Sequence, residues 1–233
     1  MDTNKVWSLI TVALRHCNRI LIHGLPGTGK SFLAQREALA GRQVYNLTLT
    51  EDTSSVELRG HYVPKGSELV WQDGAAIKAW RTGGRLIVNE LDKASSDVQS
   101  FLLGLMDDRE SASMTLPTGE TVTPAPGFQF VATSNSGPEE LPEALRSRMA
   151  VSIEVTQPNP EAVAALPEHL RKVAVATATV EQEDRRISLR AWYEYARLLE
   201  NQDTTAEEAA FLVFGSRAAD IMSNLAMAEE VKV

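Results

Sequence analysis

The sequence predicts a three-layer α/β sandwich with a parallel five-stranded sheet, followed by a small helical region. Three observations favour this fold. Short apolar runs alternate with segments of helical spacing up to residue 155, which is typical of parallel strands joined by helices. The breaker cluster Gln157-Pro158-Asn159-Pro160 ends the alternation, and the residues after it are rich in alanine and glutamate. Hydrophobic residues make up 43% of the 233, enough for a buried core.

Each expected strand is a short run with an apolar centre, such as Leu86-Ile87-Val88 in the third. The strands are expected at residues 19–23, 43–47, 85–89, 128–133 and 149–155. Apolar residues at helical spacing, beginning with Val6, Trp7 and Ile10, predict a helix before the first strand. The helices are expected at residues 4–16, 31–40, 51–60 (capped by Thr50 or Asp52), 74–80, 95–107, 142–147 and from 158 onward, including 189–199.

Two segments interrupt the alternation and predict β-hairpin inserts. In residues 61–73, two strand-like runs flank the turn sequence Pro64-Lys65-Gly66-Ser67. In residues 111–124, two further runs flank Pro117-Thr118-Gly119. We therefore expect an α/β domain at residues 1–157, which carries both hairpins, and a helical domain at residues 158–233.

Charge and cysteine content narrow the function classes. The net charge of −8 disfavours nonspecific binding to nucleic acid, although it leaves room for a local basic patch. Cys17 is the single cysteine, so it forms no intramolecular disulfide, and this fits a reducing compartment. Residues 1–19 lack the apolar stretch of a signal peptide, and no later segment is long and apolar enough to span a bilayer. We expect a cytoplasmic protein that does not enter a membrane.

The most informative motif is the run from Gly24 to Ser31, which fits G-x-x-x-x-G-K-[ST] at every fixed position. Its glycines permit positive φ angles, so successive backbone N–H groups can surround an anion. Lys30 supplies a charge for the β- and γ-phosphates, and Ser31 a hydroxyl for Mg²⁺. A strand before the loop and a helix after it favour nucleotide binding over a simple Gly/Pro turn. The candidate ATP-binding residues are Gly24, Leu25, Pro26, Gly27, Thr28, Gly29, Lys30, Ser31 and Phe32.

Polar residues at the end of the third strand predict the chemistry. Hydrolysis of a phosphoanhydride needs Mg²⁺ beside the phosphates and a group that orients or deprotonates water. Glu90 is the candidate base, and Asn89 stands where an aspartate usually supports the metal. Ser31 and Asn89 are thus the candidate metal residues. Asp92 and Lys93 fit equally well as solvated residues that start the next helix.

Further candidates follow later in the chain. Asn135 ends the fourth strand, where an amide can reach the γ-phosphate and the attacking water. Arg146 and Arg148 can neutralise charge on the transferred phosphoryl group, and such an arginine can act in trans. Arg190 opens a helix in the C-terminal region and can fold back on the phosphates from a lid.

The order of these motifs resembles the AAA+ ATPases over nearly the whole chain. The two hairpins, the run Leu91-Asp92-Lys93-Ala94-Ser95 and residues 137–148 resemble the MoxR-like branch, which includes MoxR, CbbQ and the chelatase motor subunits. The resemblance implies a C-terminal helical lid and a hexameric ring. It implies Lys30 and Ser31 as Walker A residues, Asn89 and Glu90 as the Walker B pair, Asn135 as sensor 1, Arg148 ahead of Arg146 as arginine finger, and Arg190 as sensor 2. Asn89 departs from the family's aspartate, which affects Mg²⁺ affinity and rate more than nucleotide binding.

The favoured function is a Mg²⁺-ATP-driven motor that remodels a partner protein from a homo-oligomeric ring. The substrate or adaptor is unidentified, and both hairpins are candidates to contact it. Three alternatives stay open. A nucleotide-gated scaffold with weak turnover is suggested by Asn89. A nucleic-acid-directed ATPase has only Lys65 and Arg81 in its support, and the net acidity counts against it. A small-molecule kinase is disfavoured by the series of sensor and finger residues.

Overall fold

The computed structural model describes residues 3–36, 41–108, 111–180, 182–201 and 203–230. Within it the chain divides into two units, each with its own core. The α/β unit comprises residues 8–24 and 30–154, and the helical unit comprises residues 1–7, 25–29 and 155–233. The division into a nucleotide-binding domain and a lid remains our proposal for what these units do.

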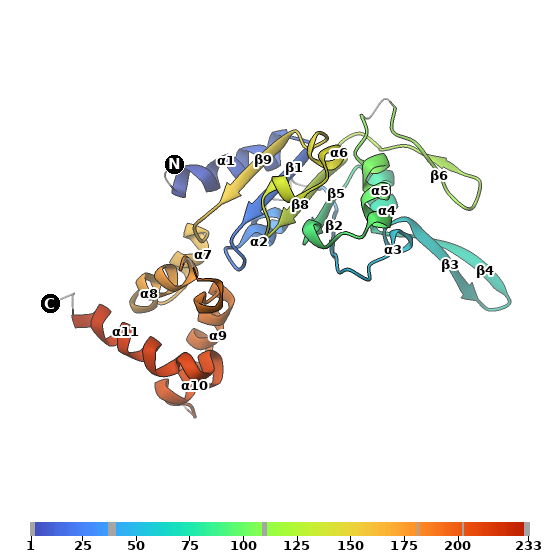
Figure 1. Ribbon diagram of the computed structural model, residues 1–233. Coiled ribbons are helices and arrows are strands. Elements are labelled where there is room, and N and C mark those ends of the chain that lie inside the picture. The colour runs from blue at the N-terminus through green and yellow to red at the C-terminus, as the bar shows by residue number, and fades with distance from the viewer. Residues whose placement is uncertain (1–2, 37–40, 109–110, 181, 202, 231–233) are drawn as a thin grey trace. The chain divides into compact units, whose positions relative to one another are not determined.

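Five strands form the main sheet, in the order β2-β5-β8-β1-β9 (Figure 1). They are β1 (Arg19–Gly24), β2 (Val44–Thr48), β5 (Arg85–Asn89), β8 (Gln129–Ser134) and β9 (Val151–Val155). The β2–β5, β5–β8 and β8–β1 pairs are parallel, and His23 of β1 lies beside Ser134 of β8. The carboxyl ends of β1, β5 and β8 therefore lie at the same end of the sheet. The predicted fold class is confirmed.

Helices pack on both faces of this sheet. Those before the helical region are α1 (Thr3–His16), α2 (Lys30–Arg36), α3 (Ser55–Arg59), α4 (Ala75–Thr82), α5 (Ser96–Leu105) and α6 (Glu143–Arg146). Successive strand residues point to opposite faces. Leu86 and Val88 of β5 join the core cluster formed with α4 and α5, whereas Ile87 is buried outside it. α1 and α2 bury Leu14 and Leu33 outside that cluster too, so they cover the other face.

Several expected helices begin or end a residue or two from the predicted bounds, and α3 differs most. α3 is shorter than residues 51–60, and its cap is Ser54, so the choice of Thr50 or Asp52 is wrong. The Ser54 hydroxyl accepts from Val56 N, and Glu57 completes a capping box. The helix expected at 31–40 is described as far as Arg36, and residues 37–40 lie outside the described part of the chain.

Both predicted hairpins are present and project from the α/β unit (Figure 1). The first is β3 (Gly60–Lys65) with β4 (Glu68–Asp73), and the second is β6 (Met114–Thr115) with β7 (Thr121–Val122). Arg81 of α4 joins the end of the first hairpin to the turn of the second, because its guanidinium contacts Asp73 at 2.7 Å and Glu120 at 2.6 Å. Tyr62 Oη also donates to Pro117 O at 3.4 Å. These contacts join the two hairpins to each other as well as to α4.

The helical unit has a separate core built on aromatic residues. Its helices are α7 (Pro160–Ala165), α8 (Glu168–Ala178), α9 (Leu189–Leu199), α10 (Ala206–Phe214) and α11 (Ala218–Glu230). Trp192 and Tyr195 of α9 pack against Phe214 with ring centroids 5.0 and 5.2 Å from it. The helix expected at 189–199 is confirmed. Across the described residues, every helix is too short or too polar to span a membrane.

A buried arginine holds the amino-terminal end of the sheet to the helices on one face. Arg85, fully buried at the first residue of β5, donates to Ala34 O of α2 and Leu14 O of α1, both at 2.8 Å. Its Nε donates to Gln129 Oε1 at 2.5 Å. Both carbonyls lie near helix C-termini, where the helix dipole favours a cation. One guanidinium thus joins two helices and two strands.

Replacing this guanidinium tests how much it stabilises the unit. We expect Arg85→Met to lower the free energy of unfolding by about 3–5 kcal/mol, because several buried oxygens lose their donor together. Urea unfolding followed by tryptophan fluorescence measures the change. Arg197→Met, at an exposed ion pair with Glu194, is the matched control and should have a much smaller effect. A loss for Arg85→Met no greater than the control's would contradict this role.

Candidate functional site

Lys30, the first residue of α2, lies almost fully buried at the carboxyl end of the sheet. Its ammonium donates to Gly24 O at 2.7 Å and to Asn135 Oδ1 at 3.2 Å. Burial lowers the pKa of Lys30 to about 8, although nearby Glu90 and Asp92 oppose the shift. Gly24 O and Asn135 Oδ1 are neutral acceptors, and a phosphate would add opposite charge beside the ammonium.

Asn135 links this lysine to the predicted base. Its side-chain Nδ2 donates to Glu90 Oε2 at 2.6 Å, while its Oδ1 accepts from Lys30. Its backbone N–H donates to Asp92 Oδ1 at 3.2 Å, which fixes the loop after β8. The structure therefore brings Lys30, Glu90 and Asn135 together in one hydrogen-bonded chain, and Asp92 supports it.

Glu90 also has an unusual backbone. Its φ of 58° makes it the one non-glycine residue with positive φ among the residues described. This left-handed conformation is disfavoured for a side chain of this kind and is concentrated at functional sites. It turns the chain sharply between β5 and the short 3₁₀ helix at residues 91–93, so that Glu90 faces Asn135.

Asn89 lies beside this chain of contacts but is held in a separate polar network. Its amide nitrogen donates to Asn46 Oδ1 at 2.6 Å and to Leu47 O at 3.0 Å, and its Oδ1 accepts from Thr133 Oγ1 at 3.1 Å. Both of its N–H donors are therefore used. An aspartate here would place a charged oxygen against the oxygens of Asn46 and Leu47, which explains why this position carries an amide.

The loop itself has the backbone that its glycines predict. Gly24, Gly27 and Gly29 have φ angles of 120°, 71° and 100°, conformations that other residues rarely adopt. The Thr28 hydroxyl donates to Leu25 O at 2.9 Å and closes the tip. This curled backbone followed by the N-terminus of α2 is an arrangement that binds phosphate.

Residues 25–29 pack within the helical unit. Asn159, the buried cap of α7, donates from its backbone N–H to Thr28 O at 2.9 Å. Gly27 approaches Ser188, the cap of α9, so closely that a Cβ on Gly27 would lie 2.5 Å from Ser188 Cβ. Arg190 is exposed two residues after that contact. Arg190, the predicted sensor 2 residue, therefore lies in the first turn of α9, and the N-cap of this helix approaches the phosphate loop at Gly27.

The two candidate finger arginines differ in their surroundings. Arg148 is paired with Asp107, with nitrogen–oxygen distances of 2.9 and 2.8 Å, and donates to Ala144 O. Arg146 ends α6 and is exposed, and the described part of the chain offers its side chain no hydrogen bond or ion pair. Among the described residues, neither Arg146 nor Arg148 has a hydrogen bond or ion pair with Lys30, Glu90 or Asn135.

Ser31 and Phe32 complete the predicted set. Ser31 is half-buried next to Lys30, and Phe32 is 53% exposed with Arg36 stacked 5.8 Å from its ring centroid. Within the described ranges, no cluster of three or more histidine, cysteine or acidic side chains could hold a metal alone.

Three residues that border the site were missed by sequence reasoning. Asn46 holds Asn89, and its signal is an amide in the middle of a short strand. Asn159 contacts the loop, and it was noted only as part of a breaker cluster. Ser188 was detectable as the N-cap immediately before a strongly amphipathic helix. All three are distant in sequence from the residues they contact or approach, so only the folded structure shows that they border the site.

Comparisons with known proteins identify the family to which the chain belongs. The family model described as AAA domain (dynein-related subfamily) matches residues 19–149, more than half of the chain. Protein NorQ of Paracoccus denitrificans is 37% identical over 128 residues, which cover 54% of this chain and 47% of NorQ. The denitrification regulatory protein NirQ of Stutzerimonas stutzeri is 30% identical over 139 residues, covering 59% of this chain and 50% of NirQ.

The solved structures match in fold. NtrX from Brucella abortus in complex with ATP aligns over 98% of this chain and 67% of its own, with a TM-score of 0.59 and 17% identity. The chain spans about half the length of the curated relatives it matches. The predicted MoxR-like resemblance is confirmed. With its phosphate loop in this fold, the chain belongs to the AAA family of P-loop ATPase domains, in the dynein-related subfamily.

Proposed function

We propose that this chain is a Mg²⁺-ATP-dependent motor that hydrolyses ATP between the subunits of a ring and remodels a partner protein. The observation that carries the proposal is the chain of contacts from Lys30 through Asn135 to Glu90. It joins a phosphate-binding cation to a carboxylate through an amide that can contact both phosphate and water. Membership of the AAA family supports the binding of ATP. The hydrogen bonds that link Lys30, Asn135 and Glu90 support its hydrolysis.

In the proposed reaction, the phosphate loop and Lys30 hold the β- and γ-phosphates. A water positioned by Asn135 and Glu90 attacks the γ-phosphorus, its proton passes to the Glu90 carboxylate, and ADP leaves. Magnesium, when bound, neutralises phosphate charge, and Ser31 and Asn89 are the residues we place beside it. Because Asn135 contacts both Lys30 and Glu90, arrival of the γ-phosphate must rearrange its hydrogen bonds.

A hollow in the helical unit offers a place for the nucleotide base. It has a volume of about 300 Å³, and Pro158, Pro160 and Val163 are among the residues that line it. Its two prolines flank Asn159, which contacts the loop at Thr28. Apolar walls next to a phosphate loop suit an adenine ring.

We place the trans-acting finger at Arg146 ahead of Arg148. An arginine finger must reach the phosphates of a neighbouring subunit, so it must be exposed and available. Arg146 meets both conditions, whereas Arg148 would first have to leave Asp107. This reverses the order that the family resemblance implied for these two residues.

The first hairpin is the proposed contact with the partner protein. Tyr62, Leu69 and Val70 are exposed on it to 44, 69 and 40%. Exposed apolar side chains on a projecting hairpin are typical of an interaction site. A cytoplasmic location belongs to the same proposal.

A nucleotide-gated scaffold with weak turnover is the second candidate. Asn89 favours it, because this amide supplies no charge to the metal and both of its N–H groups are committed to Asn46 and Leu47. Such a protein would bind ATP through the same loop and would differ mainly in rate.

The pH dependence of ATP affinity tests Lys30. Its pKa of about 8 should rise when phosphate binds, so binding should take up a proton above pH 8. We expect ATP affinity to fall by up to about tenfold per pH unit above pH 8. Calorimetry in buffers of different ionisation enthalpy measures the uptake.

The matched variants make this result specific. Lys30→Met should weaken ATP binding at pH 7 and remove the pH dependence above pH 8. Lys78→Met, on the exposed side of α4, should change neither. Proton uptake that persists in Lys30→Met would show that another group binds the phosphates.

Turnover of Glu90→Gln tests the base. The change keeps the shape of the side chain and removes its basicity, so ATP should still bind while turnover falls by about 10²-fold or more. Phosphate release measured beside nucleotide affinity separates the two effects. Equal turnover in the variant and the parent would remove Glu90 from the role. Tight ATP binding with negligible turnover in the parent chain would favour the scaffold.

Mixing experiments identify the finger. Arg146→Ala should lower turnover by about 10²-fold or more and leave ATP affinity nearly unchanged, because the finger acts on transition-state charge. Arg148→Ala is the matched control and should lose much less. Mixing Arg146→Ala with Glu90→Gln chains should recover hydrolysis at interfaces where an intact Glu90 meets an intact Arg146. Mixtures that stay inactive at every ratio would contradict a shared site.

A further inference from the structure

Two helices of this chain expose apolar side chains on surfaces of opposite charge. On α10, Phe211 and Leu212 are each 68% exposed. On α1, Leu9 and Val12 are 42% and 51% exposed. Adjoining exposed apolar side chains are a feature of interaction sites, which makes both helices candidate contact surfaces.

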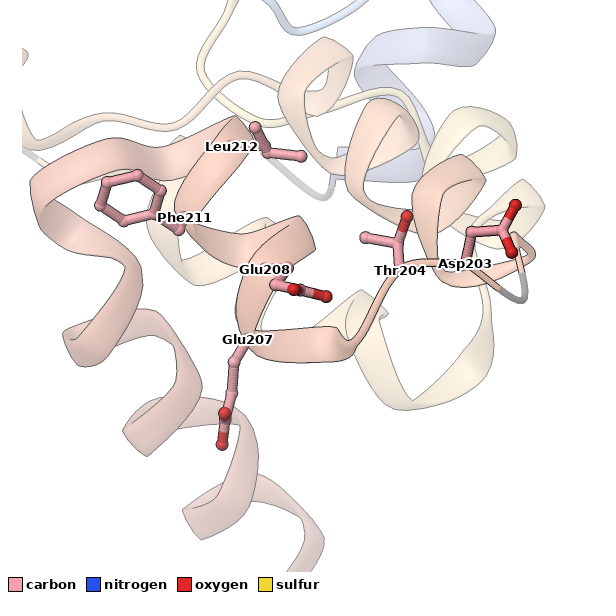
Figure 2. Close-up of a pocket in the computed structure, with 6 residues that line it drawn as sticks. All are labelled: Asp203, Thr204, Glu207, Glu208, Phe211 and Leu212. Carbon is pink, nitrogen blue, oxygen red and sulfur yellow. The ribbon is translucent and has the colours of Figure 1, made fainter.

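The α10 surface is acidic. Figure 2 shows Phe211 and Leu212 on the same helix as Glu207 and Glu208, with Asp203 on the preceding segment. These residues line an open hollow of about 540 Å³. α10 contains no basic residue. Glu208 is engaged in the capping box with Thr205, so the charge that faces a partner comes mainly from Glu207 and Asp203.

The α1 surface is basic. Lys5, Leu9, Val12 and His16 recur at spacings of four, three and four residues, which places them on one stripe of the helix. Arg15, also exposed, lies beside the stripe in the last turn, and α1 contains no acidic residue. On each helix, a charged residue precedes the exposed apolar pair by one turn: Lys5 on α1 and Glu207 on α10.

We propose that the α10 surface of one copy docks on the α1 surface of the next copy. The complementary charge argues for this occupant, because α1 carries basic and no acidic residues, α10 carries acidic and no basic residues, and the whole chain has a net charge of −8. The two surfaces are different, so the contact is head-to-tail, and each copy offers one of each. Contacts of this kind form a ring when the rotation between successive copies closes, as the proposed function requires. The inference rests on the ring in the proposed function and names the surfaces that build it.

Paired substitutions on each surface test the contact in the full chain. Phe211→Gln with Leu212→Gln removes the apolar part of the α10 surface, and Leu9→Gln with Val12→Gln removes that of α1. All four positions are exposed, and glutamine suits a helix, so both variants should fold. Met227→Gln, 61% exposed on α11, is the matched control. Sedimentation velocity with Mg²⁺ and ATP measures assembly, and circular dichroism checks the fold.

We expect the parent and the control to assemble, less so as salt rises, and each double variant to stay monomeric. An equal mixture of the two double variants should form dimers and stop there, because one intact pair of surfaces remains. Assembly of either double variant at the parental level would overturn the inference, and so would a mixture that stays monomeric or a parent that never assembles. Phosphate release is measured on the same samples. A parent that assembles through these surfaces without hydrolysing ATP would contradict the proposed function and leave the contact standing.

Discussion

Parallel pairing of β1, β5 and β8 is the constraint on which the rest of the site depends. It places the carboxyl ends of three strands side by side, so residues 24, 90 and 135, far apart in sequence, reach the same place. The register is held from the opposite end, where the buried Arg85 joins α1, α2, β5 and β8. A slip of one residue would turn every side chain to the other face and separate Asn135 from Glu90.

The buried charge of Lys30 is the main electrostatic feature at this end of the sheet. The Lys30 ammonium is buried at an energetic cost, which its lowered pKa reports, and a bound phosphate would relieve that cost. Asn135 connects Lys30 to Glu90, because its amide oxygen accepts from the Lys30 ammonium and its amide nitrogen donates to the Glu90 carboxylate. Glu90 keeps a strained left-handed backbone that aims its carboxylate there. Under the proposed function, a change at the phosphate would reach Glu90 through this single side chain.

Much of this was predictable from sequence, for physical reasons. The strands have apolar centres, the loop needs glycine at Gly27, and strand-end polar residues such as Glu90 and Asn135 must meet if the sheet is parallel. The cap of α3 was assigned wrongly because several nearby residues have capping side chains, and only tertiary structure selects Ser54. The network that holds Asn89 was also beyond prediction, since pairing between β2 and β5 decides which amide it meets.

A crystal structure of the Glu90→Gln chain with Mg²⁺ and ATP tests the central claim most directly. The account predicts that Lys30 Nζ leaves Asn135 Oδ1 for the β- and γ-phosphate oxygens. It also predicts that a water lies between the γ-phosphate, Asn135 and the substituted side chain at position 90. Phosphates bound away from Lys30, or a Lys30–Asn135 bond that survives unchanged beside a bound nucleotide, would contradict it.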